Sequence, residues 1–168
     1  MFYYLILMLC FSDSVPQEQE IAITFSLPTI STTVYHRPYV SIWLETTERR
    51  GIQTLSVWSA DPEWLRDLRQ WWRKLGHKSL EKLDGISGAT RKPGKYIIHS
   101  KIRRDDGEPL PPGKYLLNFE VVREEGGREY LRQEIVIGST ESQQWILHGK
   151  TEIGGITISI PASQSEHQ

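Results

Sequence analysis

The sequence predicts a mainly β protein of one domain, an antiparallel β-sandwich that carries one amphipathic α-helix. At 168 residues the chain is large enough for one proper core, with little room for a second. Six Trp, seven Tyr and four Phe, with 13 Gly and nine Pro, are typical of short strands joined by tight turns. The 20 basic and 21 acidic residues nearly cancel, so the net charge points to neither nucleic acid nor an anionic membrane as partner.

Strands in the first part of the chain are predicted from alternating apolar and polar residues. This pattern occurs in IAITFSL (21–27), in YVSIWLE (39–45) and within RRGIQTLSVWS (49–59). A turn at Gly51 is expected to make residues 39–58 a hairpin.

The second part of the chain alternates strand and turn. We expect a β-meander through PGKYIIHSKIRR (93–104), KYLLNFEVVRE (114–124) and EGGREYLRQEIVIG (125–138), followed by short strands at 143–149 and 155–161. Strands at this regular spacing, with turn signals between them, favour an immunoglobulin-like sandwich.

One helix is predicted at DPEWLRDLRQWWRKLG (61–76), before the SGAT loop. Its apolar residues recur at helical spacing and form one stripe: Trp64, Leu65, Leu68, Trp71, Trp72 and Leu75. Asp61 suits the N-cap, Pro62 the first helical position and Gly76 the C-terminal cap. The stripe therefore requires a partner surface on which to pack.

The N-terminus begins MFYYLILMLCF, an apolar run that is too short to span a bilayer but long enough for a signal-peptide core. Residues 1–14 are expected to be a signal peptide or N-terminal anchor, 15–20 a linker, 21–161 the single immunoglobulin-like domain and 162–168 a polar tail. Cys10 is the sole cysteine, so the mature domain is expected to lack disulfides.

Common catalytic and metal motifs are missing from the sequence. The five histidines show no HxH, HxxxH or HExxH spacing, which argues against a zinc site. No GxSxG nucleophile elbow and no GxxxxGK[ST] or GxGxxG phosphate cradle occurs. These residues offer no motif for catalysis, and we expect no stand-alone enzyme.

The segment DGISGAT (84–90) resembles the acceptor motif of bacterial ApbE-type flavin transferases, D-[GA]-x-[ST]-[GS]-A-T. All its fixed positions match: Asp84, Gly85, Ser87, Gly88, Ala89 and Thr90. In such acceptors FMN is joined through its phosphate to the final threonine. The resemblance thus implies covalent FMN on Thr90, with the other five residues as the recognition motif.

The residue types of this motif suit a modification site. Gly85, Gly88 and Ala89 keep side-chain bulk away from the backbone, so the segment could lie extended in another enzyme's active site. Thr90 offers a hydroxyl that can attack a phosphoanhydride once a base or metal activates it. Thr90 is then a substrate and not a catalyst.

The residues next to the motif leave two interpretations open. Arg91 and Lys92 could pair with the negative charge that a phosphodiester keeps. Alternatively, the segment is a plain loop between helix and strand, in which Asp84 and Ser87 make turn hydrogen bonds.

Further candidates for contact with a flavin lie elsewhere in the chain. His36, Arg37 and Tyr39 of HRPY, with Trp58 and Trp72, could stack on the ring or hold its phosphate. The alternative for both tryptophans is plain core packing. For His36 and Arg37 the alternative is hydrogen bonding where the strand begins.

Several blocks in order, from YHRPYVSIWLE (35–45) to DDGEPLPPGKYLLNFEVVREEGGRE (105–129), resemble a family of bacterial predicted periplasmic proteins of unknown function. The resemblance covers about residues 20–138. That family is similar, in its second half, to the immunoglobulin-like domain of flagellar hook-capping proteins. The resemblance implies a periplasmic β-sandwich that works with ApbE-type flavin transferases or membrane-bound PepSY-type reductases.

The leading hypothesis is a periplasmic electron-transfer protein with FMN on Thr90. A flavin-free immunoglobulin-like binding or scaffold module is the alternative, in which an aromatic-rich edge docks a partner chain. A carbohydrate- or cell-wall-binding module is the third possibility, suggested by aromatic residues on a sandwich.

Overall fold

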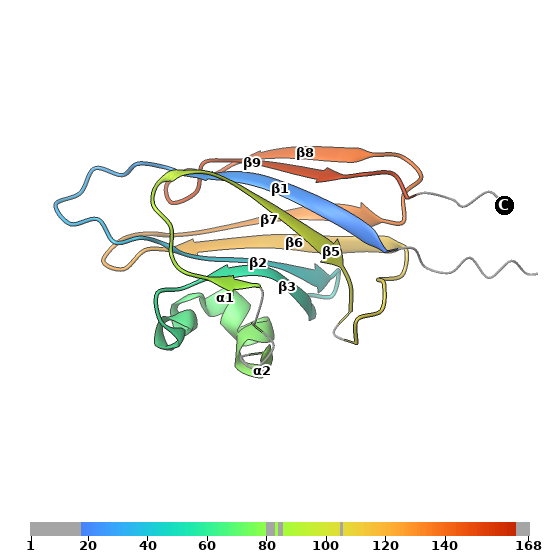
Figure 1. Ribbon diagram of the computed structural model, residues 1–168, viewed down its shortest axis with the longest axis horizontal. Coiled ribbons are helices and arrows are strands. Elements are labelled where there is room, and N and C mark those ends of the chain that lie inside the picture. The colour runs from blue at the N-terminus through green and yellow to red at the C-terminus, as the bar shows by residue number, and fades with distance from the viewer. Residues whose placement is uncertain (1–17, 80–82, 84–85, 105, 164–168) are drawn as a thin grey trace, which may run out of the picture.

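The structure is a computed structural model that describes residues 18–79, 83, 86–104 and 106–163. Two sheets face each other as a β-sandwich, and a helical layer lies beneath the five-stranded sheet in Figure 1. The four-stranded sheet has the order β5 (Gly94–Ile102), β1 (Gln19–Leu27), β9 (Gly155–Ile160), β8 (Gln143–His148). The five-stranded sheet has the order β4 (Ser87–Gly88), β3 (Gly51–Trp58), β2 (Tyr39–Thr46), β6 (Gly113–Val122), β7 (Arg128–Ile137). The mainly β fold and the sandwich are confirmed.

The strands lie where the alternating pattern predicts them, but the expected meander is wrong in one respect. β5 pairs with β1, whereas β6 pairs with β2 and β7, so the chain crosses between the sheets after β5. In this crossing Leu110 is buried in the core between the sheets, and Arg103 forms an isolated bridge with Pro109. The connection from β5 to β6 is therefore a crossover between the sheets and not a hairpin.

The immunoglobulin-like assignment is a finer prediction, and the strand order favours it. β1 and β5 pair as strands B and E do in that fold, and β3-β2-β6-β7 have the order C′-C-F-G. The C-terminal strand β9 pairs with β1 on the side opposite β5. There it occupies the place that the first strand holds in immunoglobulin domains.

β2 is buried on both of its faces. Val40, Ile42 and Leu44 belong to the main core between the sheets. Tyr39 and Trp43 face the other way, into a second core under the helical layer. The amphipathic stripe predicted for the helix finds its partner surface here.

The helical layer is a chain of short segments and not the single helix expected over 61–76. It comprises a 3₁₀ turn, η1 (Pro62–Asp67), then α1 (Arg69–Trp71), a π segment η2 (Trp72–Gly76) and α2 (His77–Ser79). Asp61 is the N-cap as predicted, because its Oδ1 accepts the Glu63 amide at 3.0 Å. Gly76 is not the C-terminal cap, since helical turns continue to Ser79.

A buried carboxylate explains the break at Leu68, where φ is −75° and ψ is 67°. Glu120 of β6 accepts the amides of Gln70 and Trp71, each at 3.0 Å to Oε2, and so caps a new helical start. The Trp71 indole donates to Thr54 Oγ1 at 2.9 Å. Burial raises the pKa of the Glu120 carboxyl above its ordinary value, although these amides oppose the shift.

The β2–β3 hairpin is present, but its turn does not lie at Gly51. Gly51 is the first residue of β3, and the left-handed position is Arg49, with φ 66°. A Cβ on residue 51 would lie 2.7 Å from Leu75 Cγ, so glycine is required for close packing of the helical layer. Arg49 is held by Glu45, whose Oε2 is 2.5 Å from Nε.

Replacing Gly51 by alanine is expected to destabilise the protein, because the new methyl overlaps Leu75. We expect the Gly51→Ala variant to lose about 1–3 kcal/mol of unfolding free energy, the usual cost of overpacking a core. Gly155→Ala is the control, since a Cβ there meets nothing within 4 Å. Urea denaturation compares the two variants, and equal midpoints would contradict the close approach at Gly51.

Candidate functional site

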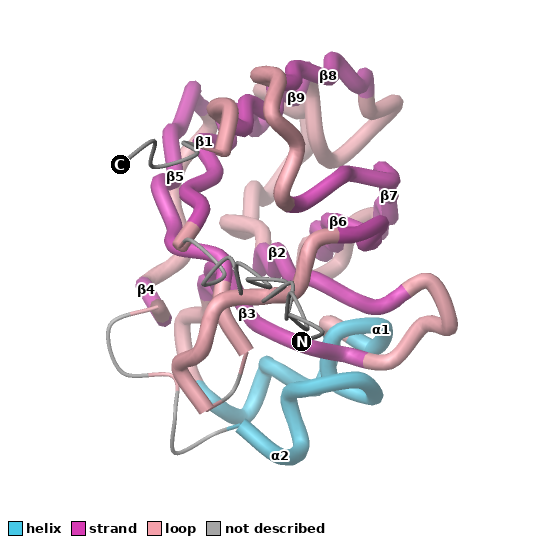
Figure 2. Tube along the Cα trace, turned by 90° about the vertical axis from the view of Figure 1, so that its right-hand side faces the viewer, coloured by secondary structure: helices cyan, strands magenta, loops and turns pink. Residues whose placement is uncertain are grey.

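Part of the sequence motif forms an edge strand. Ser87 and Gly88 make up β4, which runs parallel to the end of β3 (Figure 2). The Val57 amide donates to the Ile86 carbonyl at 3.0 Å, and the Ser59 amide donates to the Gly88 carbonyl at 2.9 Å. The expectation of a plain loop is therefore wrong for these residues. Asp84 and Gly85 lie outside the described residues.

Thr90 follows β4 in the segment that joins the two sheets. Figure 1 shows this segment at one end of the sandwich, running from the five-stranded sheet to β5. The Thr90 side chain is half-buried, and its neighbours Ala89 and Arg91 are exposed. Gly88 lets the chain lie close to Trp58, because a Cβ on it would approach Trp58 Cδ1 to 3.4 Å. The motif thus rests on the edge of the core with its end accessible.

Arg91 stacks on aromatic rings at the end of the core. Its guanidinium carbon lies 4.2 Å from the centroid of the Trp58 ring and 5.3 Å from that of Tyr96. The Tyr96 hydroxyl donates to the Lys92 carbonyl at 2.5 Å. Trp58 and Tyr96 also contact each other edge to face, with centroids 5.2 Å apart. These contacts fasten the segment that carries Thr90 onto the core.

Two basic side chains, Arg91 and Lys92, follow Thr90 in this segment. Among the described residues, no carboxylate lies within ion-pair distance of Arg91 or Lys92. The guanidinium carbon of Arg91 lies over the Trp58 ring, and its N–H groups are donors that suit an anionic group. The segment can therefore accommodate one added negative charge.

A buried ion pair joins the turn after β6 to the loop between β8 and β9. Arg123 and Glu152 form two hydrogen bonds, both 3.1 Å long, and Glu152 also accepts the Gly127 amide at 2.8 Å. The Arg123 guanidinium lies 5.8 Å from the Tyr35 ring centroid. Burial raises the pKa of Tyr35, and Glu152 and Tyr96 add to this rise while Arg123 opposes it. Tyr96, which is hydrogen-bonded to Lys92 in the segment that carries Thr90, is thus one of the residues that raise the pKa of Tyr35.

No sequence signal pointed to this ion pair. Its two members are 29 residues apart, and no spacing rule connects them. The glycine pair 126–127 indicated a turn, which is present, but not its packing. A Cβ on Gly127 would lie 2.4 Å from the Glu152 carboxylate, and this close approach becomes visible only in the folded chain.

His36 and Arg37 lie near the turn that follows β6. His36 Nδ1 is 3.5 Å from a carboxylate oxygen of Glu124, and its Nε2 is 3.8 Å from one of Glu125. Arg37 is exposed. The polar contacts of His36 are thus with acidic residues of the turn, so a role for His36 or Arg37 at a flavin remains a prediction.

The predicted aromatic candidates are divided between the two cores. Trp58 is 2% exposed in the main core, and Tyr39 is 3% exposed in the second. Trp72 is partly buried in the helical layer, with Arg66 over its ring at 5.7 Å. Trp58 lies beside the motif, while Tyr39 and Trp72 pack under and within the helical layer.

The profile of one protein family, described as "Predicted periplasmic protein (DUF2271)", matches residues 20–155. The chain belongs to this family. No curated protein and no solved structure matches it. The family description agrees with the expected periplasmic location. The expected signal peptide or anchor, residues 1–14, lies outside the described residues.

Within 18–79, 83, 86–104 and 106–163, no group of three or more His, Cys, Asp or Glu could hold a metal ion. None of the helices in the described part of the chain is long and apolar enough to cross a membrane.

Glu129 of β7 shapes the β8–β9 loop, which lies at the same end of the sandwich as the Thr90 segment (Figure 1). Its carboxylate accepts four consecutive amides of the loop, those of residues 150–153, and the Glu152 amide is bound at 2.8 Å. Burial alone would raise the pKa of Glu129, but the amide hydrogen bonds outweigh it and lower this pKa below 4.5. The carboxylate form therefore stabilises the fold.

Replacing Glu129 by glutamine is expected to cost about 2–3 kcal/mol of unfolding free energy near neutral pH, because charged hydrogen bonds are lost. The wild-type advantage is present above pH 4.5 and disappears as the pH falls through the lowered pKa of Glu129. Urea denaturation at several pH values measures both effects. Glu134→Gln on the same strand is the exposed control, with an expected change within about 0.5 kcal/mol. A pH-independent difference would contradict the role of the Glu129 charge.

Proposed function

We propose that this periplasmic protein carries FMN attached to Thr90 and transfers electrons between a membrane-bound PepSY-type reductase and a further acceptor. The observation that carries this proposal is the position of the half-buried Thr90, at the end of a complete DGISGAT motif and between exposed neighbours. When bound, FMN supplies one- and two-electron chemistry that the side chains of the protein lack.

Attachment requires a second enzyme, an ApbE-type flavin transferase. In this reaction the Thr90 oxygen forms a bond to the flavin-side phosphorus of a flavin adenine dinucleotide. The phosphoanhydride bond breaks, AMP leaves, and the hydroxyl proton passes to a base of the transferase. The protein itself supplies the acceptor hydroxyl and a recognisable segment.

The edge position of β4 supports recognition by a transferase. β4 is the last strand of its sheet, and it pairs with β3 on one side. The exposed Ser87 side chain lies within it. An edge strand can pair with a strand of another protein, so the motif can be bound in extended form without unfolding the core.

The residues next to Thr90 fit the product of this reaction. A phosphodiester keeps about one negative charge, and Arg91 and Lys92 follow directly. The stacking of Arg91 on Trp58 positions its guanidinium beside the attachment point. The cationic side chains therefore hold the phosphate side of the cofactor, while the only group of this chain that enters the new bond is the Thr90 oxygen.

Exposed hydrophobic side chains favour the alternative, a flavin-free binding or scaffold module. Val34, Trp64, Ile97 and Ile146 are exposed by between 42% and 65%. Such residues can dock a partner chain. Ile97 and Ile146 share the outer face of the four-stranded sheet. This alternative, however, gives no role to the complete flavinylation motif.

Co-expression with an ApbE-type transferase in an exporting host tests the proposal. Intact mass should increase by the mass of one FMN less one water, because the Thr90 hydroxyl becomes esterified, and the attached isoalloxazine should make the protein absorb visible light. Thr90→Ala should remain colourless and unmodified. Thr32→Ala, which alters an exposed threonine of another loop, should still gain the added mass.

The opposite result is equally clear. A wild-type protein that keeps its unmodified mass beside an active transferase and a known acceptor would refute flavin attachment. It would leave the binding module as the better interpretation.

A further inference from the structure

The outer face of the four-stranded sheet contains a trough that runs along its two central strands. In one cross-strand row, Ile97 of β5 is opposite Thr24 of β1, Thr24 is opposite Thr157 of β9, and Thr157 is opposite Ile146 of β8. The central strands therefore present short side chains, and the two edge strands present long ones. A floor of small residues lies between two isoleucine walls.

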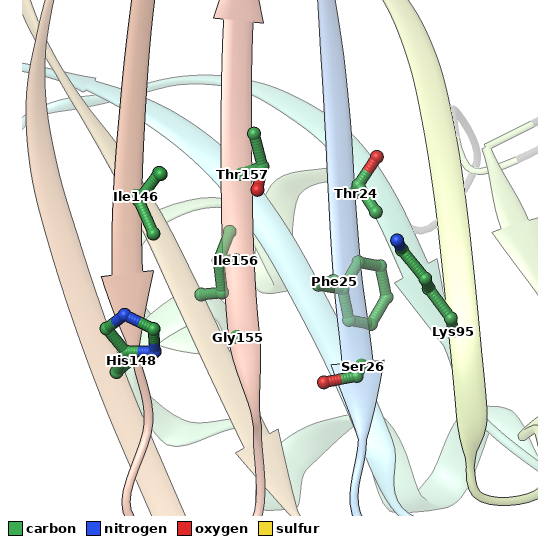
Figure 3. Close-up of a pocket in the computed structure, with 9 residues that line it drawn as sticks. All are labelled: Thr24, Phe25, Ser26, Lys95, Ile146, His148, Gly155, Ile156 and Thr157. Carbon is green, nitrogen blue, oxygen red and sulfur yellow. The ribbon is translucent and has the colours of Figure 1, made fainter.

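A second row repeats this arrangement nearer to the Thr90 segment. Lys95 of β5 is opposite Ser26 of β1, and Gly155 of β9 is opposite His148 of β8. A Cβ on Gly155 would meet nothing within 4 Å, so the floor is open there. Figure 3 shows these side chains on four adjacent strands, with the Lys95 side chain reaching toward β1.

The trough has the size and shape for a planar ring. The groove measures 310 Å³, at the lower end of the range of about 300–1,000 Å³ that holds small ligands. Edge strands three spacings apart leave a floor roughly 14 Å wide. Lys95, Ile146 and His148 line its sides, and Ile146 is 65% exposed. Ile97, which is 59% exposed, stands next to this groove on β5.

The trough begins close to the attachment point. β5 starts at Gly94, directly after the segment that carries Thr90, and Lys95 is the first trough residue on β5. Five peptide units separate Thr90 from Lys95, so their Cα atoms are at most about 17 Å apart. The flexible ribityl phosphate arm of FMN can extend across the remaining gap.

We propose that the isoalloxazine ring of FMN on Thr90 lies flat in this trough, an inference that rests on the proposed function. The apolar end of the ring contacts Ile146 on β8, and its polar end faces Lys95 on β5, the strand that also carries Ile97. The small floor residues allow close contact with one ring face. The other face stays open to solvent, where a redox partner can approach it.

Charge complementarity supports this orientation. Reduced flavin gains negative charge on its polar edge, and a lysine ammonium next to that edge stabilises the charge. Among the described residues, no carboxylate lies within ion-pair distance of Lys95. Its ammonium is therefore available to the ring.

The test uses full-length protein co-expressed with the transferase, and it measures two independent properties. Intact mass reports attachment at Thr90. Iodide quenching and anisotropy of flavin fluorescence report whether the ring is held against the protein. The two variants are the pair Ile97→Ser with Ile146→Ser, which removes the walls, and Gly155→Leu, which fills the floor. Val34→Ser, at a residue 58% exposed outside the trough, is the control.

We expect all three proteins to keep the added mass. In the two trough variants iodide quenching should rise severalfold and anisotropy should fall, whereas Val34→Ser should resemble the wild type. The midpoint potential should also fall in Lys95→Gln but not in Lys101→Gln, a lysine of the same strand beyond the trough. Equal quenching in all proteins with the mass retained would overturn the trough as the ring site and leave flavin attachment standing.

Absence of the added mass would instead refute the proposed function, and the trough then has its own test. Riboflavin is titrated against the unmodified protein while backbone amide shifts are followed by NMR. Saturable shifts at Ile146 and Gly155 would support a flavin site reached without attachment. No saturable shift in the trough would overturn the inference.

Discussion

The burial of β2 on both faces is the constraint from which the position of the candidate site follows. Its inner face completes the core of the sandwich, and its outer face carries Tyr39 and Trp43, which require a cover. The helical layer provides that cover and buries Leu83 with it. The Leu83 carbonyl then accepts the amides of Ile86 and Ser87 and directs the chain into β4. The position of Thr90 thus follows from the need to cover the outer face of β2.

Buried carboxylates hold the helical segments and loops in defined positions on the sheets. Glu120 fixes the start of α1, Glu129 fixes the β8–β9 loop, and Glu152 with Arg123 joins that loop to the turn after β6. Each accepts backbone amides or a guanidinium, as a buried charge must to be tolerated. Loops at the end of the sandwich are therefore anchored from strands and not only from their own turns.

The alternating pattern predicted the strands well because side-chain burial on a pleated sheet has a period of two. It could not assign strands to sheets, which depends on where turn residues such as Leu110 pack, and so the meander was wrong. The break in the helix at Leu68 depends on Glu120, some 50 residues away, and helical periodicity contains no trace of it. The sequence pattern therefore predicts the strands, whereas contacts between distant residues determine where the helical segments begin and end.

The same distinction applies to the candidate site. The motif could be found from the sequence because its seven residues are contiguous. The contact of Arg91 with Trp58 could not be found from the sequence, because the two residues are 33 positions apart in the chain. Nor could the trough, whose rows combine strands from both ends of the chain.

The two outer faces of the sandwich differ in a way that needs an explanation. One is covered by the helical layer, while the other leaves Ile97 and Ile146 exposed. Burying an isoleucine side chain contributes about 1.5–3 kcal/mol to folding. Ile97 and Ile146 remain exposed, so the fold does not gain this contribution from them. Two such residues flanking a floor of short side chains indicate a surface shaped for contact. The uncovered face is also the one that β5 joins directly to the Thr90 segment, which makes a tethered ring a suitable occupant.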